Sequence, residues 1–354
     1  MIVHVVGNRP QFIKLAPLYF ALKSSGAEQS IIHSGQHYDP SLSQIFFDEL
    51  NIPKPAVNLG VGSGTHAEIT AKALVGVERE LLQLKPDLVI VYGDTDTTLA
   101  AALAASKLHI PLAHVEGGER THSRTNPEEQ NRIVTDHLSS VIFCPDMIAV
   151  ENTKLEGIEN NSYCTGDIMY DTFLNCAKRE KENNDPIILM TWHRQENTES
   201  KERMESILNF VEKLNDKVIC PMHPRTQKCL KQFGLWEKAL GISGFSIIDP
   251  VGYLEMVALM QSARLILTDS GGVSKESSFA GAKCLFMVDL DVWIDLMNIG
   301  WIQKVNVEDE KSVQSALKFA QEAQRVETDK RPRLYGDGHA AQKMVQILKE
   351  KKFI

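Results

Sequence analysis

Short apolar runs alternate with longer amphipathic stretches along the whole sequence. The runs of the first half are apolar on both faces, which is typical of strands buried in a parallel sheet. We expect strands at Ile2–Val6, Ser30–Ser34, Leu88–Tyr92, Leu112–Val115 and Val141–Cys144. Apolar spacings of three and four predict helices at Leu15–Leu22, Ala67–Leu84 and Thr97–Lys107. This alternation predicts an open, doubly wound α/β domain.

The second half repeats the pattern after a charged segment. Residues 178–185 are all charged or Asn and precede Pro186, so they are the best candidate for a linker. Strands are expected at Ile187–Thr191, Val218–Pro221, Phe245–Ile248, Leu265–Thr268 and Leu285–Val288. Helices are expected at Lys201–Leu214, Tyr253–Gln261, Lys275–Phe279, Val313–Gln321 and from Ala340 to about Lys349. The sequence therefore predicts two similar α/β domains, with ligands bound beyond the carboxyl ends of their strands.

Composition narrows the choice of function. A chain of 354 residues favours two domains. The net charge of −8 lacks the basic footprint of a nucleic-acid-binding protein. The amino terminus has no cationic leader and no apolar run has a spanning length, so we expect neither a signal peptide nor a membrane anchor. Six scattered cysteines without a CxxC pair predict reduced thiols in a cytoplasmic protein and no structural zinc.

Charged residues follow several predicted strands of the first half. Arg9 and Lys14 follow a glycine turn at the start of a helix, which predicts a phosphate cradle; an ordinary turn with solvated charges is the alternative. Asp94 and Glu116 follow two strands, and Glu128 lies in a third acidic cluster. Asp94 alone could cap a helix, but three acidic clusters at one sheet edge favour proton transfer.

The second half offers histidines and a glycine turn. His193 and His223 close two consecutive strands without metal-ligand spacing, so acid–base or phosphate roles compete with purely structural ones. Residues 268–277, TDSGGVSKES, predict a strand, a turn with exposed N–H groups and a helix, an arrangement that receives a diphosphate. Glu276 could bind ribose; a serine-capped tight turn is the alternative. The pattern matches neither GxGxxG nor GxxxxGK[ST], so NAD and ATP are not expected.

Eight motifs occur in order across nearly the whole chain: GNRPQFIKLAPL, SGQHYD, KPDLVIVYGDTDTTLA, PEEQNR, TWHRQEN, MHPR, LILTDSGGVSKE and YGDGHA. Together they resemble the non-hydrolysing UDP-N-acetylglucosamine 2-epimerases. IIHSGQHYD and GDIMYD look like the branch acting on UDP-2,3-diacetamido-2,3-dideoxyglucuronate. The resemblance implies an α/β fold of the glycosyltransferase B type, with two doubly wound Rossmann-like domains facing a cleft. The expected domains are residues 1–168 and 169–338, with a C-terminal helix over 339–354 that could cross back to the first domain.

The resemblance also implies residue roles. Arg9 and Lys14 would neutralise the diphosphate of a UDP-sugar. Its oxygens would be bound by Ser270, Gly271 and Gly272, and its ribose by Glu276. The reacting sugar would be surrounded by the catalytic residues Asp94, Glu116, Glu128 and His193, with His223 nearby.

The implied reaction inverts C2 of the sugar, converting UDP-GlcNAc to UDP-ManNAc. Anti elimination of UDP gives a 2-acetamidoglucal, to which UDP adds again. The resemblance implies an isomerase that needs no metal or cofactor and forms a cytoplasmic homodimer, with a UDP-sugar as its partner and neither nucleic acid nor membrane.

Three departures keep alternatives open. Gly117-Gly118-Glu119 resembles the hydrolysing 2-epimerases, which release ManNAc and UDP. Val288 and Val292 depart from the family and Trp293 is shared with the diacetamido-uronate branch, so that uronate is an alternative substrate. Gln36 and His37 match a second, activating UDP-GlcNAc site, whereas residues 64–65 do not. A glycosyltransferase or a nucleotide-sugar-binding regulator on the same fold is the alternative from another class.

Overall fold

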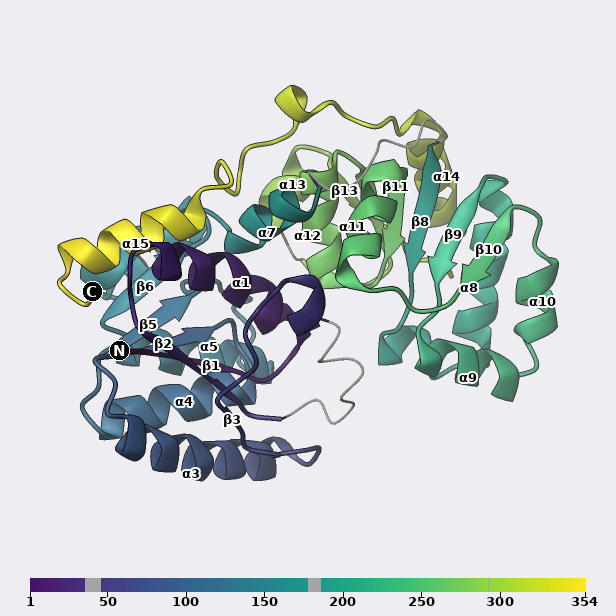
Figure 1. Ribbon diagram of the computed structural model, residues 1–354. Helices are drawn as coiled ribbons and strands as arrows, with labels where there is room; N and C mark the ends of the chain where they lie inside the picture. The colour runs from purple at the N-terminus through teal and green to yellow at the C-terminus, as the bar shows by residue number, and fades with distance from the viewer. Residues whose placement is uncertain (36–45, 178–185, 292) are drawn as a thin grey trace. The chain divides into compact units, whose positions relative to one another are not determined.

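The chain divides into two α/β units. The computed structural model describes residues 1–35, 46–177, 186–291 and 293–354 (Figure 1). One unit comprises Met1–Asn175 together with Arg333–Ile354, and the other comprises Cys176–Pro332. The sequence-based boundaries were residues 168 and 338, and the expected linker at 178–185 lies outside the described residues.

The first unit is built on a parallel sheet. Its seven described strands lie in the order β3-β2-β1-β4-β5-β6-β7, and every neighbouring pair is parallel. The strands are β1 Ile2–Val6, β2 Gln29–His33, β3 Val57–Asn58, β4 Leu88–Tyr92, β5 Leu112–Val115, β6 Val141–Cys144 and β7 Ser162–Cys164. All residues of β1, β4, β5 and β6 are buried, as the continuous apolar runs predict for a sheet covered on both faces.

Helices cover the two faces of this sheet. They are α1 Arg9–Ser24, α3 His66–Leu84, α4 Asp96–Lys107, α5 Pro127–Leu138, α6 Met147–Leu155 and α15 Ala340–Glu350, while α7 Ile168–Ala177 runs across the unit boundary. Helix α15, drawn in yellow, packs beside the purple α1 on one face, and α3 and α4 lie together on the other (Figure 1). The carboxylate of Asp171 accepts hydrogen bonds from the first N–H groups of α15, those of Ala340 (3.0 Å) and Ala341 (2.8 Å).

The second unit repeats the arrangement. Its six described strands lie in the order β10-β9-β8-β11-β12-β13, again all parallel. They are β8 Ile187–Thr191, β9 Val218–Pro221, β10 Phe245–Ile248, β11 Ala263–Thr268, β12 Lys283–Phe286 and β13 Ile302–Lys304. The helices are α8 Lys201–Leu214, α9 Pro224–Gln232, α10 Trp236–Gly241, α11 Tyr253–Ser262, α12 Gly271–Ala280, α13 Ile294–Asn298 and α14 Glu310–Glu322. Helix α8 packs against α14, and α11 packs against α12.

Helices α1 and α12 show the largest differences from the predicted starts, and both begin earlier than the apolar spacing predicts. Helix α1 starts at Arg9 rather than Leu15, because Asn8 caps it and its first turns bury the polar side chains of Gln11 and Lys14. Helix α12 starts at Gly271 rather than Lys275, where Ser270 is the N-cap. The prediction for β12 was placed two residues late, and the short strands β3, β7 and β13 were not predicted.

None of the helices in the described ranges combines the length and the apolar character that crossing a membrane requires. All six cysteines fall in those ranges and are free, in agreement with the expected reduced thiols.

Candidate functional site

In the first unit, charged side chains gather where β4 and β5 end. Lys14 of α1 forms an ion pair with Glu116, and their side chains are only 7% and 14% exposed. Gly93 lies beside this pair: a Cβ there would be 3.2 Å from Nζ of Lys14 and 3.4 Å from Oε2 of Glu116. The positive φ of Gly93 (61°) also favours glycine. The structure therefore brings Lys14 and Glu116 together, far apart as they are in sequence.

Asp94 has a partner that the sequence analysis missed. The Arg132 guanidinium of α5 forms an ion pair with Asp94 and lies 3.6 Å from Oε2 of Glu129. Burial acts to lower the pKa of Arg132, but the surrounding carboxylates of Asp94, Glu119, Glu116 and Glu129 raise it overall. Arg132 is thus a fixed cation among acidic groups, and the PEEQNR motif contains it.

Glu128 and Glu129 have different surroundings. Glu129 is buried and accepts hydrogen bonds from the backbone N–H groups of Thr121 (2.8 Å) and His122 (3.0 Å), so it shapes the loop before α5. Glu128 is exposed in the first turn of α5, where Asn126 caps the helix. The structure leaves the predicted catalytic Glu128 accessible and gives its neighbour a structural role.

Buried side chains hold three consecutive carbonyl groups at the end of β4. The oxygen of Tyr92 accepts from Gln11 Nε2 and Thr98 Oγ1, both at 2.8 Å. The oxygen of Gly93 lies 2.7 Å from His114 Nε2. The oxygen of Asp94 accepts from Asn131 Nδ2 at 2.9 Å. Gln11 also accepts from Gly7 N (2.6 Å), which ties the end of β1 to the end of β4.

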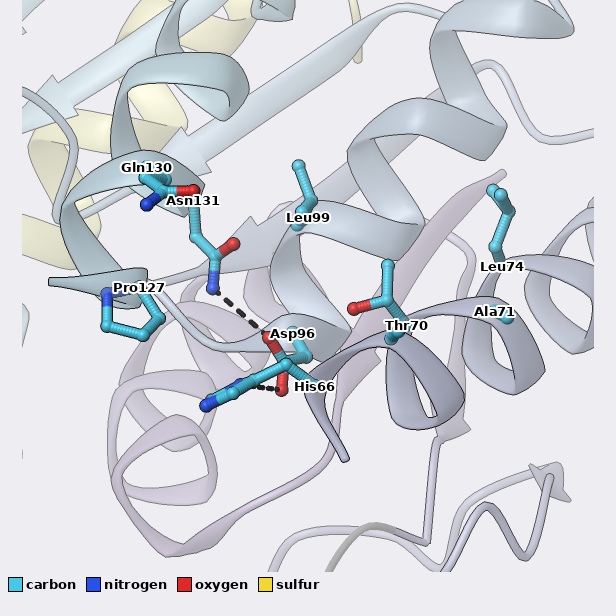
Figure 2. Close-up of a pocket in the computed structure, with 10 residues that line it drawn as sticks. His66, Thr70, Ala71, Leu74, Asp96, Leu99, Pro127, Gln130 and Asn131 are labelled. Carbon is cyan, nitrogen blue, oxygen red and sulfur yellow. Dashed lines mark hydrogen bonds and ion pairs between the residues drawn. The ribbon is translucent and has the colours of Figure 1, made fainter. Parts of the chain in front are cut away.

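A pocket of about 410 Å³ lies beside this segment, among α3, α4 and α5 (Figure 2). His66 Nδ1 is 2.9 Å from Asp96 Oδ2, and Asn131 Nδ2 is 3.5 Å from Asp96 Oδ1. Asn131 therefore contacts both the pocket wall and the backbone of Asp94. None of the residues predicted from sequence to form the site lines this pocket.

In the second unit, the TDSGG segment forms the predicted strand, turn and helix. Ser270 is the N-cap of α12 and accepts from Val273 N at 3.4 Å. Cβ atoms added at Gly271 or Gly272 would meet no heavy atom within 4 Å. The first turn of α12 therefore offers N–H groups beside open space, which suits an anionic ligand.

Asp269 organises the turn that carries His193. Its buried carboxylate accepts from the backbone N–H groups of His193 (3.0 Å) and Arg194 (2.9 Å) and from Asn197 Nδ2 (3.2 Å). Nδ1 of His193 lies 3.3 Å from Asp269 Oδ1. The His193 side chain is 40% exposed, and its ring centre is 5.7 Å from that of His223. The two predicted histidines are thus neighbours, and Asp269 is a functional candidate that the sequence analysis left without a role.

Further contacts surround the same helix. Glu276 is buried and its Oε1 accepts from the Tyr253 hydroxyl at 2.7 Å. Trp293 donates from Nε1 to the Gly271 oxygen (2.8 Å), and its ring centre lies 4.3 Å from Nζ of the buried Lys275. Trp293 is therefore attached to the first turn of α12.

The remaining predicted residues are dispersed or outside the described ranges. Arg9 is exposed at the start of α1, with its guanidinium 5.1 Å from the Phe46 ring centre. Gln36, His37 and Val292 lie outside the described residues. Within the described ranges, no group of three or more His, Cys, Asp or Glu side chains could hold a metal ion.

These features define an α/β protein of two parallel-sheet units, each with charged groups at the carboxyl ends of its strands. A family model described as UDP-N-acetylglucosamine 2-epimerase matches residues 21–349. The chain belongs to the UDP-N-acetylglucosamine 2-epimerase family, so the predicted family and α/β fold class are confirmed.

Individual relatives match along nearly their whole length. A UDP-N-acetylglucosamine 2-epimerase homolog of Methanococcus maripaludis is 44% identical, over 98% of this chain and 99% of its own. A UDP-2,3-diacetamido-2,3-dideoxy-D-glucuronate 2-epimerase of Pseudomonas aeruginosa is 40% identical, with the same coverage. The structure of the Methanocaldococcus jannaschii UDP-GlcNAc 2-epimerase with UDP-GlcNAc and UDP superposes with a TM-score of 0.88, at 38% identity and 99% coverage of both chains.

Proposed function

We propose that the protein inverts C2 of a UDP-2-acetamido sugar, converting UDP-GlcNAc to UDP-ManNAc without hydrolysis. The observation that carries this proposal is the pair of carboxylates at neighbouring strand ends. Asp94 follows β4 and Glu116 follows β5, and each is paired with a different cation, Arg132 or Lys14. Membership of the family supplies the reaction class.

The chemistry explains why more than one proton-handling group is needed. The C2 hydrogen is not α to a carbonyl, so its removal alone would leave an unstabilised carbanion. If a base takes this proton while the C1–O bond breaks, the C2–H electrons form the C1=C2 bond and UDP leaves with the bonding pair. Protonation of the glucal on the opposite face of C2 and re-addition of UDP complete the inversion. We propose that Asp94, Glu116 and Glu128 supply the proton-handling groups.

The second unit is proposed to bind the nucleotide. Ser270, Gly271 and Gly272 would place helix N–H groups on the diphosphate, and open space beside both glycines supports this role. Glu276, held by Tyr253, would accept from the ribose hydroxyls. We propose that Arg9 and Lys14 offset the diphosphate charge.

His193 and His223 are proposed to act next to the departing diphosphate. Asp269 favours the His193 tautomer that carries its hydrogen on Nδ1, which leaves Nε2 as an acceptor. The proximity of the His193 and His223 rings supports a shared task, such as receiving a proton or binding a phosphate oxygen.

The glycine run after Glu116 has a packing explanation that does not depend on hydrolysis. A Cβ at Gly117 would lie 2.5 Å from Ile142 Cγ2 and 2.6 Å from Asp136 Oδ1. At Gly118, φ is 80° and a Cβ would lie 2.4 Å from the Ala149 oxygen. Local packing therefore requires both glycines, whichever molecule attacks C1.

A second candidate substrate is the 2,3-diacetamido uronate. The Pseudomonas aeruginosa relative named for that sugar is 40% identical to this chain. Trp293, whose presence resembles that branch, lies on the first turn of α12. The reaction would be the same, with a different sugar.

Proton NMR of UDP-GlcNAc incubated with the protein in D2O tests these proposals. Deuterium at C2 with a growing UDP-ManNAc signal is the expected result. Free ManNAc would indicate hydrolysis, and an unchanged spectrum followed by turnover of the uronate would assign the second substrate. Asp94→Asn and Glu128→Gln should abolish exchange; normal epimerisation by both variants would refute the assigned mechanism.

We further propose that the enzyme is a cytoplasmic homodimer, as the family and the free thiols suggest. Light scattering of the eluted protein would give its oligomeric state.

A further inference from the structure

His114 of β5 lies beneath the carboxylates described above and has an unusual set of partners. Its side chain is 0% exposed. Nδ1 lies 2.7 Å from Asp136 Oδ1, and Nε2 lies 2.7 Å from the Gly93 oxygen. A carbonyl oxygen only accepts, so Nε2 must carry a hydrogen.

Asp136 faces the other nitrogen of the ring, Nδ1. Oδ2 of Asp136 already accepts from Arg120 Nη1 (2.7 Å) and from Gly118 N (3.0 Å). Burial would raise the pKa of Asp136, but His114 and Arg120 outweigh this effect and hold it below its ordinary value. Asp136 is therefore ionised, and both ring nitrogens of His114 face acceptors.

Further charged groups continue outward from Asp136. Arg120 makes a two-pronged contact with Glu156, from Nε to Oε1 (2.7 Å) and from Nη2 to Oε2 (2.8 Å). His114, Asp136, Arg120 and Glu156 thus form one hydrogen-bonded network of four side chains, in which both carboxylates have partners. The nearby titratable groups are His137, 3.7 Å from Glu156, and the Cys144 thiol, whose pKa is raised by burial and by Asp136.

This network of side chains holds both backbone segments that carry the candidate catalytic carboxylates. Through Nε2, His114 holds the carbonyl of Gly93, the residue before Asp94. Glu116 follows His114 by two residues and has φ 67°, a left-handed conformation that is strained for a residue with a side chain. The next residue, Gly117, packs so closely that a Cβ would lie 3.0 Å from His114 Nδ1.

His4 shows that burial alone does not impose this arrangement. It is also fully buried in the same sheet, but Nδ1 faces the Tyr92 hydroxyl (2.7 Å) and Nε2 faces Gln29 Oε1 (2.9 Å). The hydroxyl can donate to Nδ1, so His4 satisfies both contacts as a neutral ring.

We propose that His114 is a positioning residue: its ring, oriented by Asp136, donates from Nε2 to the Gly93 carbonyl and so directs the carboxylates of Asp94 and Glu116. The proposal rests on the proposed function, in which these carboxylates act on the sugar. It assigns His114 no contact with substrate.

The first experiment uses the unaltered protein. Nitrogen-15 NMR of histidine-labelled protein should show a His114 ring whose Nε2 carries a slowly exchanging hydrogen. A His114 ring with its hydrogen on Nδ1 alone would overturn the proposal, whether or not the protein epimerises UDP-GlcNAc.

The second experiment compares three variants in the epimerisation assay. His114→Gln and Asp136→Asn should each lower kcat by about 10²-fold, the effect expected of a misplacement near 1 Å, with KM changed less than about three-fold. His4→Gln, the matched buried control, should lower the melting temperature but leave kcat within about two-fold.

If His114→Gln and Asp136→Asn fold and keep kcat within about three-fold of the unaltered protein, the contacts of His114 with Asp136 and Gly93 are merely structural and the proposal fails. If neither variant folds, the nitrogen-15 spectrum decides. Failure of the proposed function would show instead as an unaltered protein that epimerises neither UDP-sugar.

Discussion

Asp269→Asn is the most informative single substitution in the second unit. The asparagine side chain fits the same space but keeps only one of the two carboxylate oxygens. If that oxygen continues to accept from the N–H groups of His193 and Arg194, the new NH2 group faces His193 Nδ1, 3.3 Å from the present oxygen. The ring would then hold its hydrogen on Nε2, which inverts the proposed tautomer.

The expected stability loss follows from the bonds that change. Oδ2 of Asp269 accepts three hydrogen bonds, one of them buried and two partly buried. A bond to a charged acceptor contributes about 1 kcal/mol more than a neutral one, so the variant should lose roughly 2–3 kcal/mol. For a unit of this size, that corresponds to a melting temperature lowered by roughly 4–12 °C.

Calorimetry and the epimerisation assay together test this prediction. If His193 handles a proton, kcat should fall on the order of 10²-fold or more, whereas a phosphate-binding role would mainly weaken UDP binding. Asp291→Asn is the matched control, because Asp291 is exposed and its ion pair with Lys304 (2.9 Å) lies at the surface. This substitution should change the stability by no more than about 0.5 kcal/mol. An Asp269→Asn protein with unchanged melting and unchanged kcat would refute the role assigned to this carboxylate.

Three further predictions concern the first unit. Arg132→Gln should lower kcat at least about ten-fold in the epimerisation assay, since Asp94 loses its counter-charge; normal turnover would contradict this. Burial lowers the pKa of His4 to about 4, so as the pH falls from about 6.5 the histidine is protonated in the unfolded protein before it is protonated in the folded one. The free energy of unfolding should therefore decrease by roughly 3 kcal/mol by pH 4. In urea titrations, His4→Gln should show a smaller decrease of the unfolding free energy over the same pH range. Gly118→Ala should destabilise the protein by more than about 2 kcal/mol, because the new Cβ would clash with the Ala149 oxygen. Gly157→Ala is the control and should cost about 1 kcal/mol, since its Cβ would have no heavy atom within 4 Å. Equal melting temperatures of the two variants would contradict the packing argument.

The sequence predicted the central strands well because parallel strands are apolar on both faces. Ile2–Val6, Leu88–Tyr92 and Ile187–Thr191 coincide with β1, β4 and β8. The prediction was wrong where buried positions are polar. Because Gln11 and Lys14 are buried but polar, the first turns of α1 show no apolar periodicity in the sequence, and the start of this helix was not predicted. Helix α5 was missed although its signal was present, since Asn126 and Pro127 followed by two glutamates are typical of a helix start.

The candidate site was predicted in part for a similar reason. Residues that follow strands, such as Asp94 and Glu116, can be found from strand positions alone. Arg132, Asp136 and Asp269 were not found because their roles depend on contacts with residues distant in sequence. Recognising α5 as a helix would have placed Arg132 one turn after Glu128, on the same side of that helix.

The return of the chain to its first unit has a consequence for synthesis. Residues 176–332 are continuous, so they can complete their unit as soon as they leave the ribosome. Helix α15 buries Ala340, Ala341, Met344, Val345 and Leu348, and these residues are translated after the whole of the second unit. Until they arrive, the face of the nascent first unit that α1 helps to form stays uncovered, so the half of the enzyme made first is the half that finishes folding last.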